Sequence, residues 1–213
     1  ILFDGGAGSI TKSTVIGINQ GASGCQEGNA IEVRNAPFDG NHPGTLQVEI
    51  SHNVVESYQK TGIVANGDVD VDIHHNVVGA SATQENLAAN SIQIGFGALG
   101  SATHNQIDGN QWKGTSDWAA TAILIYDASP GVEVSQNNIG GNSDIGVDVF
   151  ADGSVVDNNR VFDDGADHLN SGYDIGIGDW GSGNAVTNNK VRGFETPYDG
   201  LGDLGSNKVI PAK

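Results

Sequence analysis

Residues 50–55 read Ile-Ser-His-Asn-Val-Val, and residues 73–78 read Ile-His-His-Asn-Val-Val. Each stretch is an apolar residue, two variable positions, an asparagine, one more variable position and a second apolar residue. The pattern occurs seven times, with its asparagine at Asn53, Asn76, Asn105, Asn137, Asn159, Asn189 and Asn207. Successive asparagines are 23, 29, 32, 22, 30 and 18 residues apart. This drifting period is typical of a solenoid whose coils carry insertions of different length.

A second alternating apolar run precedes the later motifs, and it begins at Ile63, Ile92, Ile123, Val147 and Ile175. The interval from that residue to the opening residue of the motif is 10, 10, 11, 9 and 11 residues. We therefore predict two strands per coil, joined by a structural turn. The connection from each motif to the next run varies from 8 to 16 residues. Variable connections usually carry function, so this corner is the expected functional edge.

One coil is too small to bury its own apolar face, so the coils must stack strand on strand, about 4.8 Å apart. The asparagines then stack in register and couple their side-chain amides from coil to coil. The residue before the asparagine is polar, and in three successive coils it is His52, His75 and His104. Histidine and asparagine tolerate positive φ. We therefore expect a bend at this position, and we interpret the histidine column as turn chemistry rather than as a metal site.

These repeats resemble the right-handed parallel β-helix of the pectate-lyase-like superfamily, and the motif resembles a short repeat of exported bacterial β-helix proteins. The resemblance covers the chain from about Ile31 onward. It implies an all-β, single-stranded parallel β-helix solenoid with an asparagine ladder. We expect one domain over residues 1–213, with an irregular N-terminal coil (1–30), regular coils (31–195) and a C-terminal end (196–213). The superfamily contains lyases, hydrolases, epimerases and non-catalytic surface proteins, so its fold does not select a function.

The charge balance restricts the partners. The chain has 26 acidic and 9 basic side chains, a net charge of -17, which disfavours nucleic acid and anionic membrane surfaces by repulsion. No segment approaches the roughly 18 apolar residues of a membrane span. The chain has a single cysteine and no methionine, which fits a processed segment. We expect a secreted or cell-surface protein that self-associates through uncapped solenoid ends.

An acidic run lies in one of the long connections. Four carboxylates in twelve positions suit a hard cation such as Ca²⁺, which prefers several oxygen ligands. A solvated acidic loop is the alternative. The expected calcium ligands are Asp163, Asp164, Asp167 and Asp174.

Aromatic residues suggest a binding face. Strand alternation directs Tyr126 and Phe150 outward, and Trp180 follows in the next coil. We expect Trp112 and Trp118 to wall one side of this track. Sugar rings stack on aromatic rings, so the arrangement predicts an extended polysaccharide ligand. The alternative is that these rings only cover loops.

The residues near the aromatic track also include candidate catalytic groups. A hydrolase would need two carboxylates across a glycosidic bond, and the candidates near the aromatic track are Asp127, Asp148, Asp152 and Asp179. A calcium-dependent lyase would need a base, for which Lys60 is the candidate. The competing class is a non-catalytic structural, adhesive or tail-fibre module, in which rigidity is the function.

Overall fold

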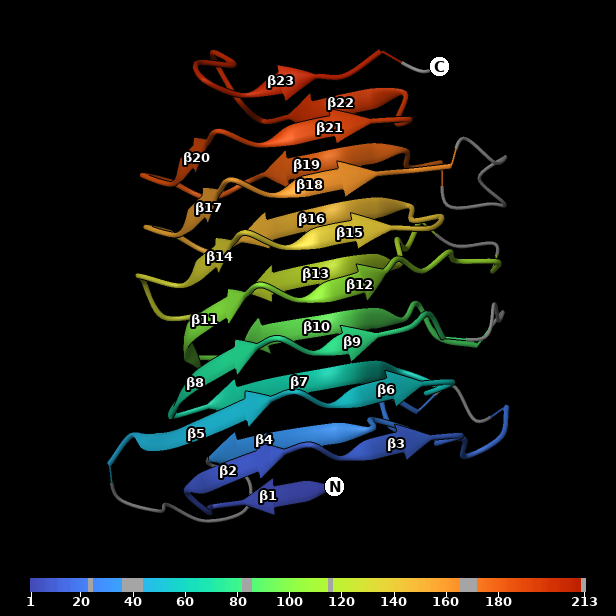
Figure 1. The fold of residues 1–213 in the computed structure, drawn as a ribbon, viewed down its shortest axis with the longest axis vertical. Coiled ribbons are helices and arrows are strands. Elements are labelled where there is room, and N and C mark those ends of the chain that lie inside the picture. Colours follow the sequence, from blue (N-terminus) through green and yellow to red (C-terminus); the bar gives the residue numbers. More distant parts are fainter. Residues whose placement is uncertain (23–24, 36–43, 82–85, 115–116, 165–171, 212–213) are drawn as a thin grey trace.

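Each regular coil contributes one strand to each of three parallel sheets, which run the length of the solenoid in the computed structural model (Figure 1). The structure describes residues 1–22, 25–35, 44–81, 86–114, 117–164 and 172–211. Sheet A contains β1 (Leu2–Asp4), β4 (Ile31–Asn35), β7 (Thr61–Gly67), β10 (Asn90–Gly95), β13 (Thr121–Tyr126), β16 (Ile145–Phe150), β19 (Ile175–Asp179) and β22 (Thr196–Asp199). Strands far apart in the sequence are therefore neighbours in space.

The other two sheets have the same order along the axis. Sheet B contains β2 (Gly8–Thr11), β5 (Leu46–Ser51), β8 (Val69–His74), β11 (Leu99–Thr103), β14 (Glu133–Ser135), β17 (Val155–Asp157) and β20 (Ala185–Thr187). Sheet C contains β3 (Thr14–Ile16), β6 (Val54–Glu56), β9 (Val77–Val78), β12 (Gln106–Asp108), β15 (Asn138–Gly140), β18 (Arg160–Phe162), β21 (Lys190–Arg192) and β23 (Lys208–Val209). The result is an all-β parallel solenoid, as the repeats predicted.

The coils have three strands rather than the two predicted from periodicity. The asparagine motif does not form one strand, because the chain turns sharply inside it. The residue before the asparagine has a positive φ in six coils, for example 57° at His52 and 56° at Asn188. The opening apolar residue therefore ends a strand of sheet B, and the closing one lies in sheet C. The predicted bend is confirmed, and it divides the motif between two sheets.

The core is a continuous aliphatic column inside the three sheets. Isoleucines recur in register along it. For example, Ile63, Ile92 and Ile123 are paired across neighbouring strands of sheet A, and all three are fully buried. Each coil contributes only a few apolar residues and so depends on its neighbours for burial. Within the described residues no helix is long and apolar enough to cross a membrane.

The motif asparagines are buried and hydrogen-bonded in series along the axis. The backbone N–H and the Nδ2 of Asn105 both donate to Oδ1 of Asn137, at 2.9 and 3.1 Å. Asn137 donates in the same way to Asn159, at 2.9 and 3.0 Å. The other proton of Nδ2 bonds a backbone carbonyl of the preceding coil, such as Ala102 O at 2.8 Å from Asn137. An asparagine such as Asn137 thus bonds both the coil before it and the coil after it.

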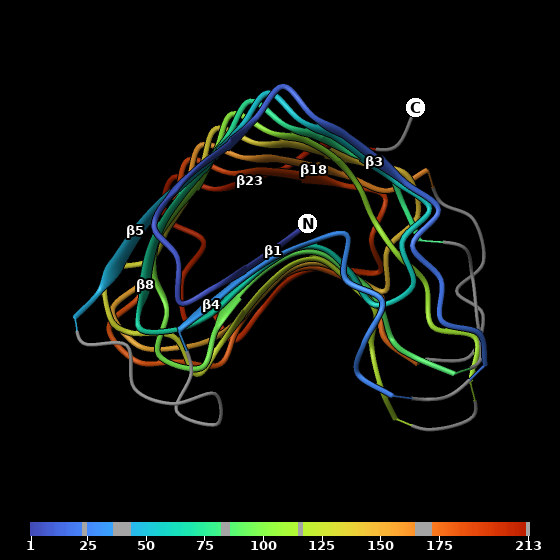
Figure 2. The same ribbon diagram turned by 90° about the horizontal axis from the view of Figure 1, so that it is seen from below.

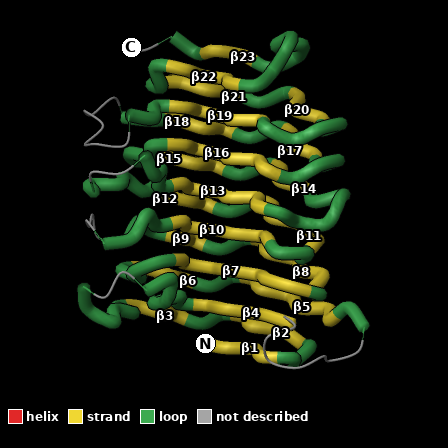
Figure 3. The backbone as a smooth tube through the Cα atoms, turned by 180° about the vertical axis from the view of Figure 1, so that it is seen from behind, coloured by secondary structure: helices red, strands yellow, loops and turns green. Residues whose placement is uncertain are grey.

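Seen along the axis, sheet A forms the concave side of the outline (Figure 2). The turns that lead from sheet C into sheet A project beyond it on one side. The view from behind shows the strands of sheet A stacked in order from β1 to β22 (Figure 3). The predicted variable corner is therefore the corner between sheets C and A, at one edge of the concave face.

Candidate functional site

A groove of about 630 Å³ lies on the outer face of sheet A. Its floor comes from β7, β10, β13 and β16, and its wall comes from the turns between sheets C and A. The wall residues include Ala88, Asp117, Trp118 and Tyr173. The long variable connections thus raise one side of a concave sheet and border the groove.

A column of four exposed aromatic rings lines this groove. Tyr126 on β13 and Phe150 on β16 are register partners, and their ring centroids are 5.8 Å apart. Trp180, just after β19, stacks on Phe150 with 6.0 Å between centroids. Phe96, just after β10, lies 5.5 Å from Tyr126. Between 43% and 54% of each residue is exposed, which leaves apolar ring surface available in every one of four successive coils.

The groove floor also carries a chain of hydrogen-bonded polar side chains. Thr121 Oγ1 donates to Asn90 Oδ1 at 3.0 Å, and Asn90 Nδ2 donates to Gln93 Oε1 at 3.0 Å. Gln93 Nε2 in turn donates to Asn66 Oδ1 at 3.2 Å. These bonds fix the orientation of amides on two neighbouring strands, β7 and β10, and link them to a hydroxyl on β13. Asn90, Gln93 and Thr121 are buried and bonded to one another, whereas Asn66 at the end of the chain is half-buried beside the aromatic column.

Asp148 is the predicted catalytic carboxylate that the structure places in the groove. It points outward from β16 but is only 5% exposed, because the indole of Trp180 lies against it. Trp180 Nε1 donates to Asp148 Oδ1 at 2.8 Å. Burial raises the pKa of Asp148 to about 6, and this hydrogen bond opposes part of the rise. A carboxyl group with such a pKa can hold or release a proton near neutral pH.

Lys60 lines the same groove immediately before β7. Its Nζ donates to the carbonyl of Ala88 at 2.6 Å, and burial lowers its pKa to about 8. Lys60 and Asp148 belong to coils three strand spacings apart, about 14 Å along the axis. They therefore lie in different parts of the groove and are too far apart to act on the same glycosidic bond of a bound glycan.

The other three predicted aspartates lie at the corner between sheets A and B, outside the groove lining. Asp127 occupies a turn with φ of 50°. Asp152 Oδ1 accepts the Ser182 N–H at 2.7 Å, and Asp179 Oδ1 accepts Asn184 Nδ2 at 2.6 Å. Their geometry is that of turn-forming aspartates. No two of the four predicted catalytic aspartates face each other across the groove.

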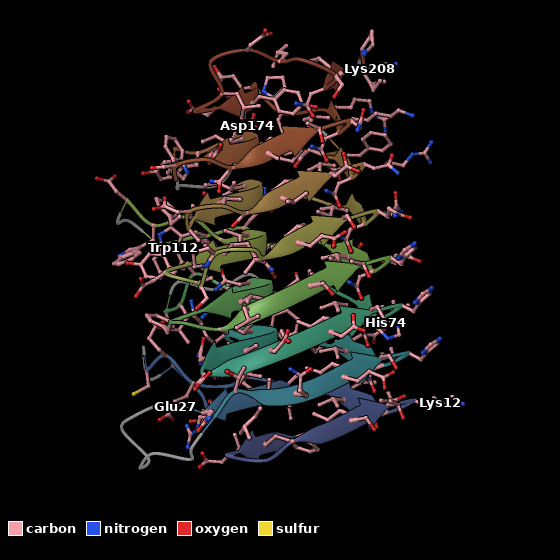
Figure 4. All side chains as sticks on the ribbon, turned by 90° about the vertical axis from the view of Figure 1, so that its left-hand side faces the viewer. Lys12, Glu27, His74, Trp112, Asp174 and Lys208 are labelled. Atoms are coloured by element: carbon pink, nitrogen blue, oxygen red, sulfur yellow. The ribbon has the colours of Figure 1, made fainter. Side chains whose placement is uncertain are left out.

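The two tryptophans of the wall differ. Trp118 lines the groove and is 66% exposed. Trp112 is 6% exposed and does not line it. In Figure 4, Trp112 lies at the opposite edge of the solenoid from His74. The Trp112 backbone N–H donates to the buried Asp144 Oδ2 at 2.7 Å, which also accepts the Ala120 N–H at 2.9 Å. Trp112 thus belongs to the interior of the loop that carries Trp118.

The predicted calcium ligands are only partly described, because Asp167 lies outside the described residues. Asp163 is buried, and its Oδ2 accepts the Ser143 N–H at 3.0 Å. Asp164 is exposed and Asp174 is half-buried. In the described part of the chain no three His, Cys, Asp or Glu side chains are grouped to hold a metal ion. Calcium binding by this loop stays a prediction.

The histidine column is a stack of imidazoles at the corner between sheets B and C. His75 is parallel to His52 and to His104 within 3°, with centroids 5.2 and 5.1 Å apart. All three have positive φ, as the turn requires. Desolvation, followed by the charge of His104, lowers the pKa of His75. The parallel rings do not converge on one point, which agrees with the turn interpretation.

Sequence reasoning missed Phe96 and the floor amides. Phe96 follows Gly95, which is the register partner of Tyr126, so it lies one position outside the strand alternation. Its φ of 53° turns it back toward the column. The amides were detectable in principle, because Gln93 occupies the same register position as Leu124 and, one coil on, Asp148.

No family model matches this chain, and neither a curated protein nor a solved structure matches it. The function must therefore be argued from the geometry of the groove.

Proposed function

We propose that the groove on sheet A binds an extended glycan whose chain follows the solenoid axis. The observation that carries this proposal is the column of Phe96, Tyr126, Phe150 and Trp180, with 5.5 to 6.0 Å between ring centroids. This interval is close to the length of one pyranose unit, so successive sugars can each stack on one ring. The half-buried amide of Asn66, held in place by Gln93, would bond to a sugar hydroxyl.

Charge favours a neutral glycan in this groove. The charged side chains among the described lining residues are Lys60, Asp117 and Asp148. Two carboxylates against one ammonium in a chain of net charge -17 would repel a polyuronate. Neutral glucans, xylans or mannans carry no such penalty. In this proposal the protein acts outside the cell or at its surface, where such polymers are found.

The test is binding of soluble neutral polysaccharides, measured by affinity electrophoresis and calorimetry. We expect at least one polymer to bind, and Tyr126→Ala or Phe150→Ala to weaken binding roughly fivefold, since one stacked aromatic ring contributes about 1 kcal/mol. Phe162→Ala is the matched control, because it removes an aromatic ring from sheet C. If no neutral polysaccharide binds, the proposal fails and a purely structural module becomes the better account. Equal losses in all three variants would also contradict it.

Glycan hydrolysis is a second candidate, favoured by the raised pKa of Asp148. Asp148 would serve as general acid, and Asp117 on the loop wall is the other carboxylate of the lining. We expect Asp148→Asn to abolish release of reducing ends while binding remains, and Asp152→Asn to leave release unchanged. If instead a polyuronate is cleaved with formation of unsaturated ends, Lys60 would be the base, and Lys60→Gln should abolish that signal. Chelator treatment of this reaction tests the calcium prediction.

We also infer the finer features of the fold. Crossovers between parallel strands are almost always right-handed, and the serial hydrogen bonds of the motif asparagines are those that an asparagine ladder needs. Both features support a right-handed parallel β-helix of the kind found in the pectate-lyase-like superfamily.

A further inference from the structure

The outer face of sheet C carries an unusual concentration of positive charge. Arg160 of β18, Lys190 of β21 and Lys208 of β23 are direct register partners. Arg192 lies beside them and stacks its guanidinium over the Phe162 ring, 4.6 Å from the centroid. We call these four cations the basic row. The whole chain has only 9 basic residues against 26 acidic ones, so nearly half of its cations gather in three coils.

None of the four cations forms an ion pair with any part of the chain that the structure describes. Asp157, at the end of β17, lies near the row but bonds to other groups. Its Oδ1 accepts hydrogen bonds from Thr187 Oγ1 at 2.6 Å and from Asn188 Nδ2 at 2.8 Å. Like charges directly opposite each other on neighbouring strands are destabilising. Folding therefore gives no reason to align three cations in register when acidic residues are abundant.

Neutral hydrogen-bond donors extend the basic row along sheet C. Asn138 of β15 pairs with Arg160, and Gln106 of β12 pairs with Asn138. Five successive coils thus present one hydrogen-bond donor each, at about 4.8 Å intervals. A ligand that matches this row must be linear, must run along the axis and must carry acceptors at a similar interval.

We propose that the basic row binds a linear acidic polysaccharide bearing carboxylates or sulfates. Such a polymer places about one anionic group on each sugar, which is close to the spacing of the coils. Lysine and arginine form charge-assisted hydrogen bonds to carboxylate and sulfate oxygens. A single polysaccharide chain is narrow enough to contact the basic row without contacting the acidic surface around it. Duplex DNA or an anionic vesicle would also meet the field of the surrounding acidic surface, since the net charge is -17.

This site is separate from the proposed glycan groove. Sheets A and C form different sides of the solenoid cross-section (Figure 2). The acidic polymer would therefore bind without occupying the aromatic column. A protein with both sites would link a neutral glycan to an acidic one.

The test compares two double variants with the same change in charge. Lys190→Gln with Lys208→Gln removes two cations of the row, and Lys12→Gln with Lys113→Gln removes two exposed lysines elsewhere. Lys12 lies at the opposite end of the solenoid from Lys208 (Figure 4). The probes are polygalacturonate and dextran sulfate, with uncharged dextran, duplex DNA and phosphatidylserine vesicles as comparisons, all at low salt.

We expect the wild type and the Lys12/Lys113 variant to bind polygalacturonate or dextran sulfate, and the Lys190/Lys208 variant to bind them roughly tenfold more weakly. Added salt should reduce this difference. Tyr126→Ala should leave the binding unchanged, which distinguishes this site from the groove. Equal binding by the two double variants overturns the proposal, as does the absence of binding to either polyanion. Preferential binding of DNA or vesicles overturns the assignment to a polysaccharide.

Thermal unfolding gives an independent measurement. Without ligand, the Lys190/Lys208 variant should melt at a higher temperature than the Lys12/Lys113 variant at low salt, because repulsion within the row is relieved. Dextran sulfate should raise the melting temperature of the wild type more than that of the Lys190/Lys208 variant. An equal rise in both proteins would contradict binding at the row.

Discussion

Trp180 donates a hydrogen bond from its indole Nε1 to the carboxylate of Asp148, one coil away, at 2.8 Å. The contact depends on the residue between them in space. Gly178 is the register partner of Asp148, and its missing side chain leaves room for the indole to lie over the strand. One glycine therefore sets both the position of an aromatic ring and the burial of the carboxylate.

Gly178→Ala should displace the indole of Trp180. A Cβ at this position would lie 2.9 Å from Trp180 Nε1 and 3.3 Å from Asp148 Oδ1, which is too close for both groups to stay. We expect a red shift of tryptophan fluorescence and weaker glycan binding, with little change in far-UV circular dichroism. Gly140→Ala is the control, because a Cβ there meets nothing within 4 Å. Identical spectra for the two variants would contradict the role given to Gly178.

Asp148 should make stability fall as pH rises. Its pKa is about 6 in the folded chain against 3.8 ordinarily, so the folded state binds the proton more tightly. The penalty is absent below about pH 4, develops between pH 4 and 6, and is complete above pH 6, where it reaches at most about 3 kcal/mol.

Urea unfolding of Asp148→Asn measures this effect. The variant should gain stability over the wild type at pH 7 and show no such gain at pH 4. Asp152→Asn, at an exposed turn, should show no comparable dependence. A wild-type advantage at pH 7 would mean that the ionised carboxylate is stabilised by contacts that outweigh its burial.

Asn137→Ala should destabilise the solenoid strongly, whereas Asn138→Ala should not. Asn137 is 1% exposed, and its loss removes the acceptor of Asn105 and the donor to Ala102 and Asn159. Each buried group left unpaired costs about 1–3 kcal/mol, so we expect a loss of roughly 2–5 kcal/mol in the free energy of unfolding. Asn138 is exposed on β15. Chemical denaturation of both variants measures this difference. Equal losses of unfolding free energy in the two variants would contradict the structural role of the serial asparagines.

Asp144→Ala should loosen the loop that walls the groove. Asp144 is fully buried, and its carboxylate accepts the N–H groups of Trp112 and Ala120. Without these bonds the loop carrying Trp118 loses two of the hydrogen bonds that hold its backbone. We expect faster limited proteolysis between residues 109 and 120 and weaker glycan binding. Asp108→Ala, an exposed residue beside the same loop, is the control, and comparable cleavage in both variants would count against this anchoring.

Local pattern was enough for much of the architecture. The seven asparagine motifs predicted stacked parallel coils, the bend before each asparagine and the corner where the variable turns gather. The number of strands per coil was wrong, because hydrophobic periodicity does not reveal that a positive φ at residues such as His52 divides a short motif between two sheets. Alternation also placed Tyr126 and Phe150 on the outer face, where they are found.

The candidate site was less accessible to sequence reasoning. Four aspartates near the aromatic residues looked equivalent in the chain, yet only Asp148 lines the groove. The difference arises because Asp127, Asp152 and Asp179 fall just where strands end and turns begin. Trp112 and Trp118 are six residues apart, but the buried Asp144 holds the backbone of Trp112 inside the loop. Such outcomes depend on side chains from other coils.

The sequence by itself determined that the chain stacks coils, because a repeat with fixed apolar positions can be buried only against its own copies. The tertiary structure alone decided which residues meet. Coil length varies from 18 to 32 residues between asparagines, so no fixed interval brings Phe150 beside Trp180, or Arg160 beside Lys190. Inter-strand register does so, because hydrogen bonds between parallel strands align equivalent positions whatever the length of the turn between them.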